Sequence, residues 1–308
     1  MSVDLRAAAA AHLTQRRARG YRLADHGWLL CSFLDGLHAR GHTTITVTDA
    51  VAFAQARPAT SRIWKATRLR AVRGLAAHVH ALDPAAAELI PAGLIPARTT
   101  RQIPYLYSDE QIVTLLSGAA ALSPALLADS MHTLIGLLAV TGLRSGEAVA
   151  LDVEDLDTDR GVLAVTGKYG KRRIVALHHT TVEALAQYRQ AHATSAPPTG
   201  ALLLAAKGGR LRPDRARAAF RAVADACDLH ARPGCGPPRL HDFRHTFAVN
   251  SLLDAHRQGV DVDARIATLA TFLGHIEPAH TYWYLSASPE LMTLVSDRVA
   301  AYQRGRRP

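Results

Sequence analysis

The sequence contains little cysteine and no long apolar run, and each shortage argues against a class of protein. Its three cysteines, Cys31, Cys227 and Cys235, cannot all pair and form no CxxC motif, which disfavours a disulfide framework and a cysteine-based zinc site. The longest apolar run, 134–140, is far too short to span a bilayer. The amino-terminal residues carry charge ahead of a short alanine tract and lack the apolar core of a signal peptide. We therefore expect a cytoplasmic protein with no membrane association.

Acidic residues and lysines are also scarce. The 308 residues include 26 Asp+Glu against 36 Lys+Arg, a formal net charge of +10, and only four of these bases are lysine. Arginine suits bidentate contacts to phosphate, although codon bias in an alanine-rich chain can also produce this composition. The excess of positive charge favours a nucleic-acid partner over a membrane surface. Hydrophobic residues make up 48% of the chain, enough for a core, and the length suits two domains.

The first third of the chain is predicted to be helical and basic. Residues 1–100 hold 13 basic and 6 acidic side chains, and apolar residues at helical spacing predict helices over 25–37, 47–55 and 61–82. The last of these helices carries a cluster of five bases that few acids offset: Arg62, Lys65, Arg68, Arg70 and Arg73. A solvated helix face would explain them, but we favour a helix that contacts DNA.

Prolines divide the chain into two parts. Four of them between residues 84 and 104 prevent a continuous helix and predict a linker over 84–104. Ser108 and Gln111 then form a capping-box pattern that begins a second domain. The predicted organisation is a helical DNA-binding domain over 1–83, the linker, and a domain over 105–308.

The second domain is predicted to be mainly α with a small antiparallel β-sheet. Two β-rich runs, 162–166 and 172–177, flank a turn with glycine on both sides of a Lys–Tyr pair, which predicts a hairpin. The helices expected around it are 109–118, 127–140, a short one from Arg144, 180–192, 213–227, 241–255, 262–273, 279–285 and 289–302.

Patterns typical of metal or nucleotide sites are incomplete. The acidic turn 155–159 resembles the start of a calcium loop, but Arg160 replaces its glycine and the final glutamate is missing. His241 and His245 have the spacing of a helical zinc pair, yet Arg244 lies on the same face. No GxxxxGK[ST] or GxGxxG motif is present. We therefore expect no metal and no cofactor.

A spaced set of cations, histidines and a tyrosine remains in the second domain. It consists of Arg144 in the segment TGLRSGE (141–147), Lys168 at the hairpin tip, His241 and Arg244 in HDFRH (241–245), His275 in LGH (273–275), and Tyr284. In order and spacing this set resembles the tyrosine recombinases, the family of phage integrases, over about 105–295. Phe243 stands where that family more often has leucine. The segment 279–284 resembles a subgroup found on mobile elements, which would carry out transposition.

This resemblance implies a two-domain clamp on double-stranded DNA, with a core-binding and an α+β catalytic domain. The catalytic residues would be Arg144, Lys168, His241, Arg244, His275 and the nucleophile Tyr284. Such enzymes exchange DNA strands in integration or excision, through a 3′-phosphotyrosine, as a homotetramer on paired sites, sometimes with helper recombinases. A type IB topoisomerase-like enzyme and a non-catalytic DNA-binding protein are the alternatives.

Two assignments within the site have rivals. Tyr282 and Tyr284 are two residues apart, about 200° around a helix, so only one can enter the site, and the family spacing selects Tyr284. Lys171 lies three residues after Lys168 and competes with it as the general acid. The tyrosine phenol, with a pKa of about 10, needs activation, and the leaving 5′ oxygen needs a proton.

Overall fold

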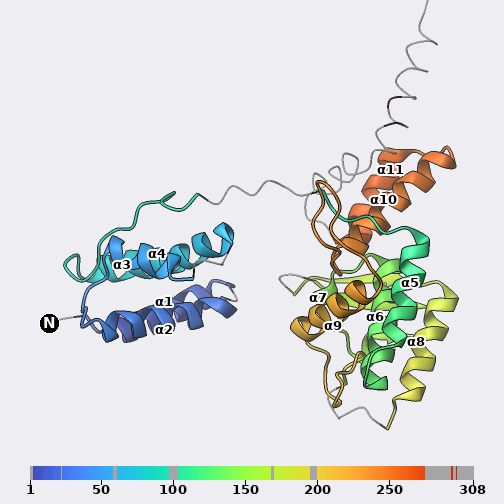
Figure 1. The fold of residues 1–308 in the computed structure, drawn as a ribbon, viewed down its shortest axis with the longest axis horizontal. Coiled ribbons are helices and arrows are strands. Elements are labelled where there is room, and N and C mark those ends of the chain that lie inside the picture. Colours follow the sequence, from blue (N-terminus) through green and yellow to red (C-terminus); the bar gives the residue numbers. More distant parts are fainter. Residues whose placement is uncertain are drawn as a thin grey trace, which may run out of the picture. The chain divides into compact units, whose positions relative to one another are not determined.

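The computed structural model describes residues 3–21, 23–57, 61–96, 103–167, 170–194 and 200–274, together with Thr293 and Ser296. The chain divides into two compact units, Met1–Arg101 and Gln102–Pro308 (Figure 1). Among the described residues, no helix combines the length and apolar character needed to cross a membrane.

The described part of the first unit is helical. Its elements are α1 (Leu5–Ala18), α2 (Ala24–Ala39), α3 (Val47–Gln55) and α4 (Arg62–Leu82). Three of them match the predicted helices to within two residues, whereas α1 was not predicted. Its alanines give weak apolar contrast along the sequence, but the Asp4 side chain accepts hydrogen bonds from two amide groups of its first turn, and Leu13 is buried.

The predicted linker 84–104 is too long, because both of its ends belong to folded units. Ala87 and Ile90 are buried in the core of the first unit. The backbone of Ile45 pairs with this segment through two hydrogen bonds of 3.0 and 2.8 Å. At the other end, Pro104 and Tyr105 are buried in the second unit. The prolines do end the helix, but an extended chain can still pack its apolar side chains and pair its backbone.

The described part of the second unit is mainly helical with one three-stranded antiparallel sheet, as predicted. Its helices are α5 (Asp109–Ala120), α6 (Ala125–Thr141), α7 (Ser145–Ala148), α8 (His179–Ala191), α9 (Pro213–Ala226), α10 (Asp242–Arg257) and α11 (Val262–Leu273), with a 3₁₀ turn at Val153–Asp155. The strands β1 (Leu156–Asp157), β2 (Val162–Thr166) and β3 (Arg172–Ala176) pair in sequence order. The capping box of Ser108 and Gln111 is confirmed. Except for Thr293 and Ser296, the predicted helices 279–285 and 289–302 lie outside the described residues.

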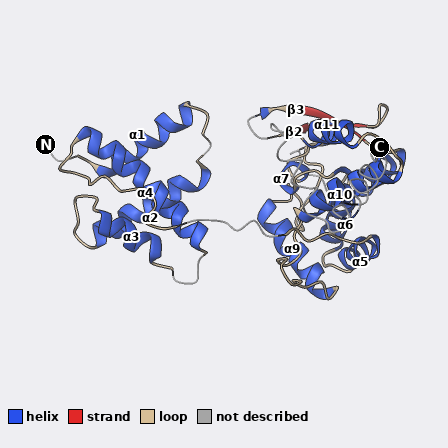
Figure 2. Cartoon of the chain, turned by 90° about the horizontal axis from the view of Figure 1, so that it is seen from above, coloured by secondary structure: helices blue, strands red, loops and turns tan. Residues whose placement is uncertain are grey.

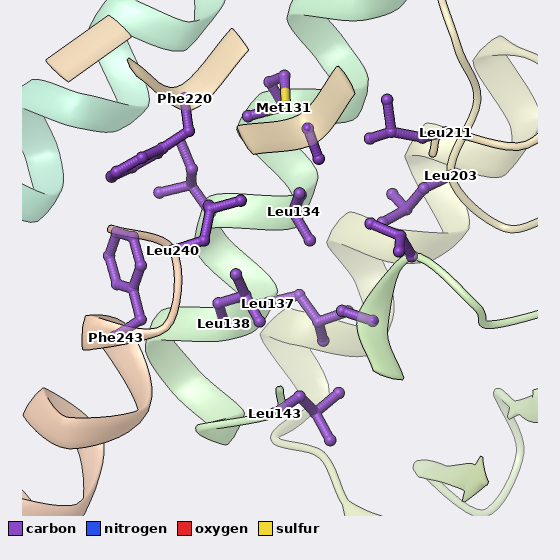
Figure 3. Close-up of a cluster of buried hydrophobic side chains, with 14 of the residues drawn as sticks. Met131, Leu134, Leu137, Leu138, Leu143, Leu203, Leu211, Phe220, Leu240 and Phe243 are labelled. Carbon is purple, nitrogen blue, oxygen red and sulfur yellow. The ribbon is translucent and has the colours of Figure 1, made fainter. Parts of the chain in front are cut away.

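Helix α6 is the centre of the second unit. It is apolar on nearly every side, as a helix enclosed by others must be, and Met131, Leu134 and Leu138 are fully buried. Phe220 of α9 and Phe243 of α10 lie close to α6 in the same cluster (Figure 3). This core holds the carboxyl end of α6 and the start of α10 in place. Figure 2 shows α11 beside strand β3, against which it packs.

Candidate active site

Arg144 is held where α6 ends. The helix stops at Gly142, whose φ of +59° is in the left-handed region, and the Gly142 amide donates to the Leu138 carbonyl. A Cβ at Gly142 would come within 2.6 Å of the Phe247 ring, so a larger residue would displace it. Leu143 is then buried, and Arg144 begins α7 with a side chain that is 37% exposed. The glycine therefore turns the chain so that Arg144 reaches the surface.

Glu147 holds Arg144 in place through hydrogen bonds. Its Oε1 accepts from Arg144 Nη1 at 2.7 Å and its Oε2 from the Arg144 amide at 3.1 Å. The same carboxylate accepts two hydrogen bonds from Arg173, of 3.2 and 2.8 Å. Burial alone would raise the pKa of Glu147, but the hydrogen bonds from the two arginines hold its pKa below the ordinary value. Glu147 is therefore a carboxylate shared by two guanidinium groups.

Arg173 is a site residue that the sequence analysis missed. It lies on the covered face of β3 with Val175, whereas Ile174 between them is 62% exposed. An arginine at the inward position of an alternating strand is unusual, and this signal could have identified it.

Arg244 lies in the first turn of α10 and is 1% exposed. Its Nη1 donates to the Gly142 carbonyl at 3.0 Å and its Nη2 to the Leu273 carbonyl at 2.8 Å. These two acceptors belong to the carboxyl ends of α6 and α11, where helix dipoles favour a cation. Because both acceptors are neutral, they orient the guanidinium without cancelling its charge.

His241 immediately precedes α10 and is surrounded by positive charge. Its side chain is exposed to solvent, yet desolvation by the surrounding protein and then the charges of Arg244, Arg239 and Arg144 lower its pKa to about 4. His241 is accordingly neutral at pH 7. Its ring meets that of His245 edge to face, with 5.0 Å between centroids.

The structure therefore brings together three of the six predicted catalytic residues: Arg144, His241 and Arg244. Lys168, His275 and Tyr284 lie outside the described residues, as do Tyr169 and Tyr282. The neighbours Gly167 and Gly274 are described. Gly167 donates to the Lys171 carbonyl at the base of the hairpin, and Gly274 ends α11 in the left-handed conformation.

Two carboxylates of the acidic turn bond to other groups of the protein. Asp155 accepts from the Asp152 amide at 2.9 Å and pairs with Arg172 at 3.5 Å, and Asp157 accepts from the Arg160 amide. Across the described ranges, no group of three His, Cys, Asp or Glu side chains could hold a metal ion. The expectation that the chain uses no metal stays a prediction.

The basic cluster on α4 does not form one face. Arg62 and Arg70 are exposed, and Lys65 and Arg73 are half-buried. Arg68 is only 4% exposed, and it donates to the Phe53 carbonyl at 2.6 Å. At 100° per residue Arg68 lies roughly 140–160° around the helix from the two bases that follow it. The prediction that Arg68 contacts DNA is therefore corrected: its guanidinium caps the end of α3 and stacks on the Phe53 ring.

Comparisons with known proteins identify the family of this chain. The sequence profile of the phage integrase family matches residues 107–290. The putative integrase/recombinase y4rB of Sinorhizobium fredii is 37% identical over 292 residues, which cover 91% of this chain and 92% of that protein. The tyrosine recombinase XerD of Mycobacterium tuberculosis is 33% identical over 236 residues, covering 73% of this chain and 70% of XerD.

A solved structure supports the fold. The integrase of transposon Tn1549, in complex with circular intermediate DNA, aligns with a TM-score of 0.61 at 16% identity, covering 94% of this chain and 99% of that one. At this identity the match concerns the fold alone. The family profile spans more than half of the chain, and y4rB is 37% identical over 91% of it. Both matches confirm the predicted resemblance, so the chain belongs to the phage integrase family of tyrosine-type site-specific recombinases.

Proposed function

We propose that this protein cuts and rejoins double-stranded DNA through a 3′-phosphotyrosine formed by Tyr284. The observation that carries the proposal is the convergence of Arg144, Arg244 and neutral His241 where α6, α10 and α11 meet. Two cations and a neutral histidine suit a reaction at an anionic phosphodiester. Lys168, His275 and Tyr284 complete the proposed set.

The arginines would stabilise the transition state without a metal ion. Attack on a phosphodiester builds further negative charge on its equatorial oxygens, and preoriented guanidinium groups offset that charge. Among the described residues, the guanidinium of Arg144 bonds to Glu147 through Nη1 alone, so its other side-chain nitrogens can face a phosphate. The enclosed Arg244 adds a charge that cannot swing away, since its two carbonyl partners hold it.

The proton transfers fall to the other residues. Neutral His241 can accept a hydrogen bond from the tyrosine or take its proton, which an imidazolium cannot do. The tyrosine oxygen bonds to phosphorus, the bond to the 5′ oxygen breaks, and Lys168 gives that oxygen a proton. The new phosphotyrosine ester is similar in energy to the bond that is lost. Attack by another 5′-hydroxyl therefore reverses the step without ATP and joins new strands.

The remaining features of the proposal concern DNA binding and assembly. Four bases of α4, namely Arg62, Lys65, Arg70 and Arg73, would supply phosphate contacts from the first unit. The outcome would be DNA integration or excision, or transposition, within a homotetramer on paired sites that can include a helper recombinase. Identity of 37% to a putative integrase/recombinase over nearly the whole chain supports this assignment.

A covalent-trapping experiment tests the proposal. DNA that the wild-type protein traps covalently is sequenced to find its target, and a nicked suicide substrate is built on that site. We expect wild-type protein to form an adduct whose phosphotyrosine maps to Tyr284. Recombinant joints between two duplexes would separate the proposal from a topoisomerase-like enzyme, which would relax supercoiled plasmid without exchange. Binding without any adduct would indicate a non-catalytic protein.

A further inference from the structure

Arg173 joins three separate parts of the second unit. Its Nη1 and Nη2 donate to the two oxygens of Glu147, and its Nε donates to the Phe272 carbonyl at 3.0 Å. Its side chain is 14% exposed, and that of Glu147 is 7% exposed. One guanidinium thus fixes strand β3, helix α7 and the end of α11 to one another, with all three kinds of its nitrogen in use.

Arg173 and Arg144 share the negative charge of Glu147 unequally. Arg173 takes both carboxylate oxygens, whereas the side chain of Arg144 takes only one of them. Within the described residues, these two arginines are the only cationic partners of Glu147. If Arg173 were removed, the enclosed carboxylate would draw Arg144 into a two-pronged pair, because a buried charge needs compensation. The guanidinium would then be turned from the phosphate and its charge cancelled.

Two glycines show how closely the chain passes Arg173. A Cβ built on Gly167 would lie 3.5 Å from Arg173 Nη1, and one built on Gly274 would lie 3.2 Å from Nη1 and Cδ. Gly274 also has a φ of +69°, where a side chain adds strain. In the sequence these glycines directly precede Lys168 and His275. Arg173 therefore lies next to both points at which the chain leads into proposed catalytic residues.

We propose that Arg173 is a positioning residue for strand cleavage, which neutralises Glu147 so that the guanidinium of Arg144 stays available to the scissile phosphate. This inference rests on the proposed function. Arg173 acts through Glu147 and Arg144, so its loss alters the stabilisation of the nonbridging oxygens. Protonation of the leaving 5′ oxygen is a separate step that this loss leaves unchanged.

The experiment compares cleavage rates on three versions of one suicide substrate. The first carries an ordinary scissile phosphate. The second carries a methylphosphonate, which lacks the charged nonbridging oxygen and so depends less on Arg144. The third carries a bridging 5′-phosphorothiolate, whose thiolate leaves without a proton. The variants are Arg173→Ala, Arg173→Lys and Arg144→Ala, and the matched control is Arg172→Ala, because Arg172 is 67% exposed and pairs only loosely with Asp155.

We expect Arg173→Ala to bind DNA like wild type and to cut the ordinary substrate about 10–100-fold more slowly, the scale of a misplaced catalytic group. The methylphosphonate should remove most of this deficit, as it should for Arg144→Ala, and the phosphorothiolate should not. The cleavage rate of Arg173→Lys should lie between those of wild type and Arg173→Ala, because lysine keeps the charge but not the paired hydrogen bonds. Arg172→Ala should match wild type. If Arg173→Ala does not fold, Arg173→Lys is subjected to the same comparison.

Three outcomes would overturn the inference. The first is a wild-type cleavage rate for Arg173→Ala. The second is recovery of the Arg173→Ala rate with the phosphorothiolate alone, which would mean that Arg173 acts through Lys168. The third is an equal loss of rate on all three substrates at an unchanged melting temperature. The proposed function is checked separately by the adduct of wild-type protein on the ordinary substrate. An absent wild-type adduct overturns that function, whereas a wild-type adduct with an unimpaired Arg173→Ala overturns only the role of Arg173.

Discussion

On α4 of the first unit, Arg62 and Arg70 are exposed and have no carboxylate partner among the described residues. In the second unit, Arg173 and Arg244 are largely or wholly enclosed, and each donates at least two hydrogen bonds to carbonyl or carboxylate oxygens. The same residue type thus serves two purposes. An exposed arginine can adapt to any phosphate, whereas one fixed by its neighbours presents its charge at a single place.

This difference teaches that net charge is a poor guide to where chemistry occurs. The first 100 residues hold 13 basic and 6 acidic side chains, a surplus of seven bases. Because the whole chain carries a net charge of +10, the remaining residues have a surplus of only three bases. The proposed catalytic centre nevertheless lies in the less basic unit. There, Glu147 and the helix ends do not add positive charge; they fix the positions of the cations.

The largest expected effect separates chemistry from binding altogether. Tyr284→Phe should bind target DNA with wild-type affinity and form no covalent adduct, because only the phenolic oxygen is lost. Gel electrophoresis of the suicide reaction measures the adduct. Tyr282→Phe is the matched control and should still form it. An adduct that persists in Tyr284→Phe and disappears in Tyr282→Phe would move the nucleophile to position 282.

The next effect tests whether the positioned arginines act on rate. Arg144→Ala and Arg244→Ala should each slow cleavage by about 10²–10³, the scale of removing one preorganised donor. Their stabilities should differ, because Arg244→Ala leaves two buried carbonyls without their donor, whereas Arg144 is partly exposed. The melting temperature should therefore fall mainly for Arg244→Ala. A cleavage rate near wild type in both variants would contradict the claim that the positioned arginines of the second unit act on the reaction rate.

The exposed bases should affect affinity and its salt dependence. Replacing Arg62, Lys65, Arg70 and Arg73 together with alanine should weaken DNA binding and reduce the slope of log K against log salt by about 3 to 4, if each base neutralises one phosphate. Binding isotherms between 50 and 200 mM salt, roughly, measure the slope. Arg68→Ala should leave it unchanged, because Arg68 is buried. A slope that responds equally to Arg68 would mean that the bases of α4 act as one group.

The smallest expected effect concerns pH. The pKa of His241 is about 4 in the folded protein, against an ordinary value of 6.5 that applies to the unfolded chain. Between pH 4 and pH 6.5, roughly, the unfolded chain therefore binds a proton at this histidine more readily than the folded protein does. The free energy of unfolding should therefore fall as pH decreases from about 6.5 towards 4. His241→Gln should show a shallower fall in urea titrations over this range. Because His241 is exposed, solvent screening limits the effect. Identical curves for the two proteins would show that neither desolvation nor the arginines lower the pKa of this histidine.

Much of the fold was predictable from local sequence. The apolar periodicity that predicted a helix over 47–55 gave the bounds of α3 without error, and the capping box of Ser108 and Gln111 marked the start of α5. Helix α1 was missed because alanines give little contrast between its faces. The segment from Pro84 onward was assigned to the linker because prolines stop a helix, although Ala87 and Ile90 still pack in the core.

The sequence by itself determined the family, through spaced motifs that include Arg144 and the pair His241 and Arg244, and it determined most helices through their period. Only the tertiary structure decided what holds these residues. Arg244 is bound by carbonyls 102 and 29 residues away, and Arg173 by a carboxylate 26 residues away. Periodicity describes neighbours on one helix or strand, whereas these contacts depend on how α6, α7, α10, α11 and β3 pack together. In the first unit, the packing of α3 against α4 buried Arg68, although its sequence neighbourhood is as basic as that of the exposed cations on α4.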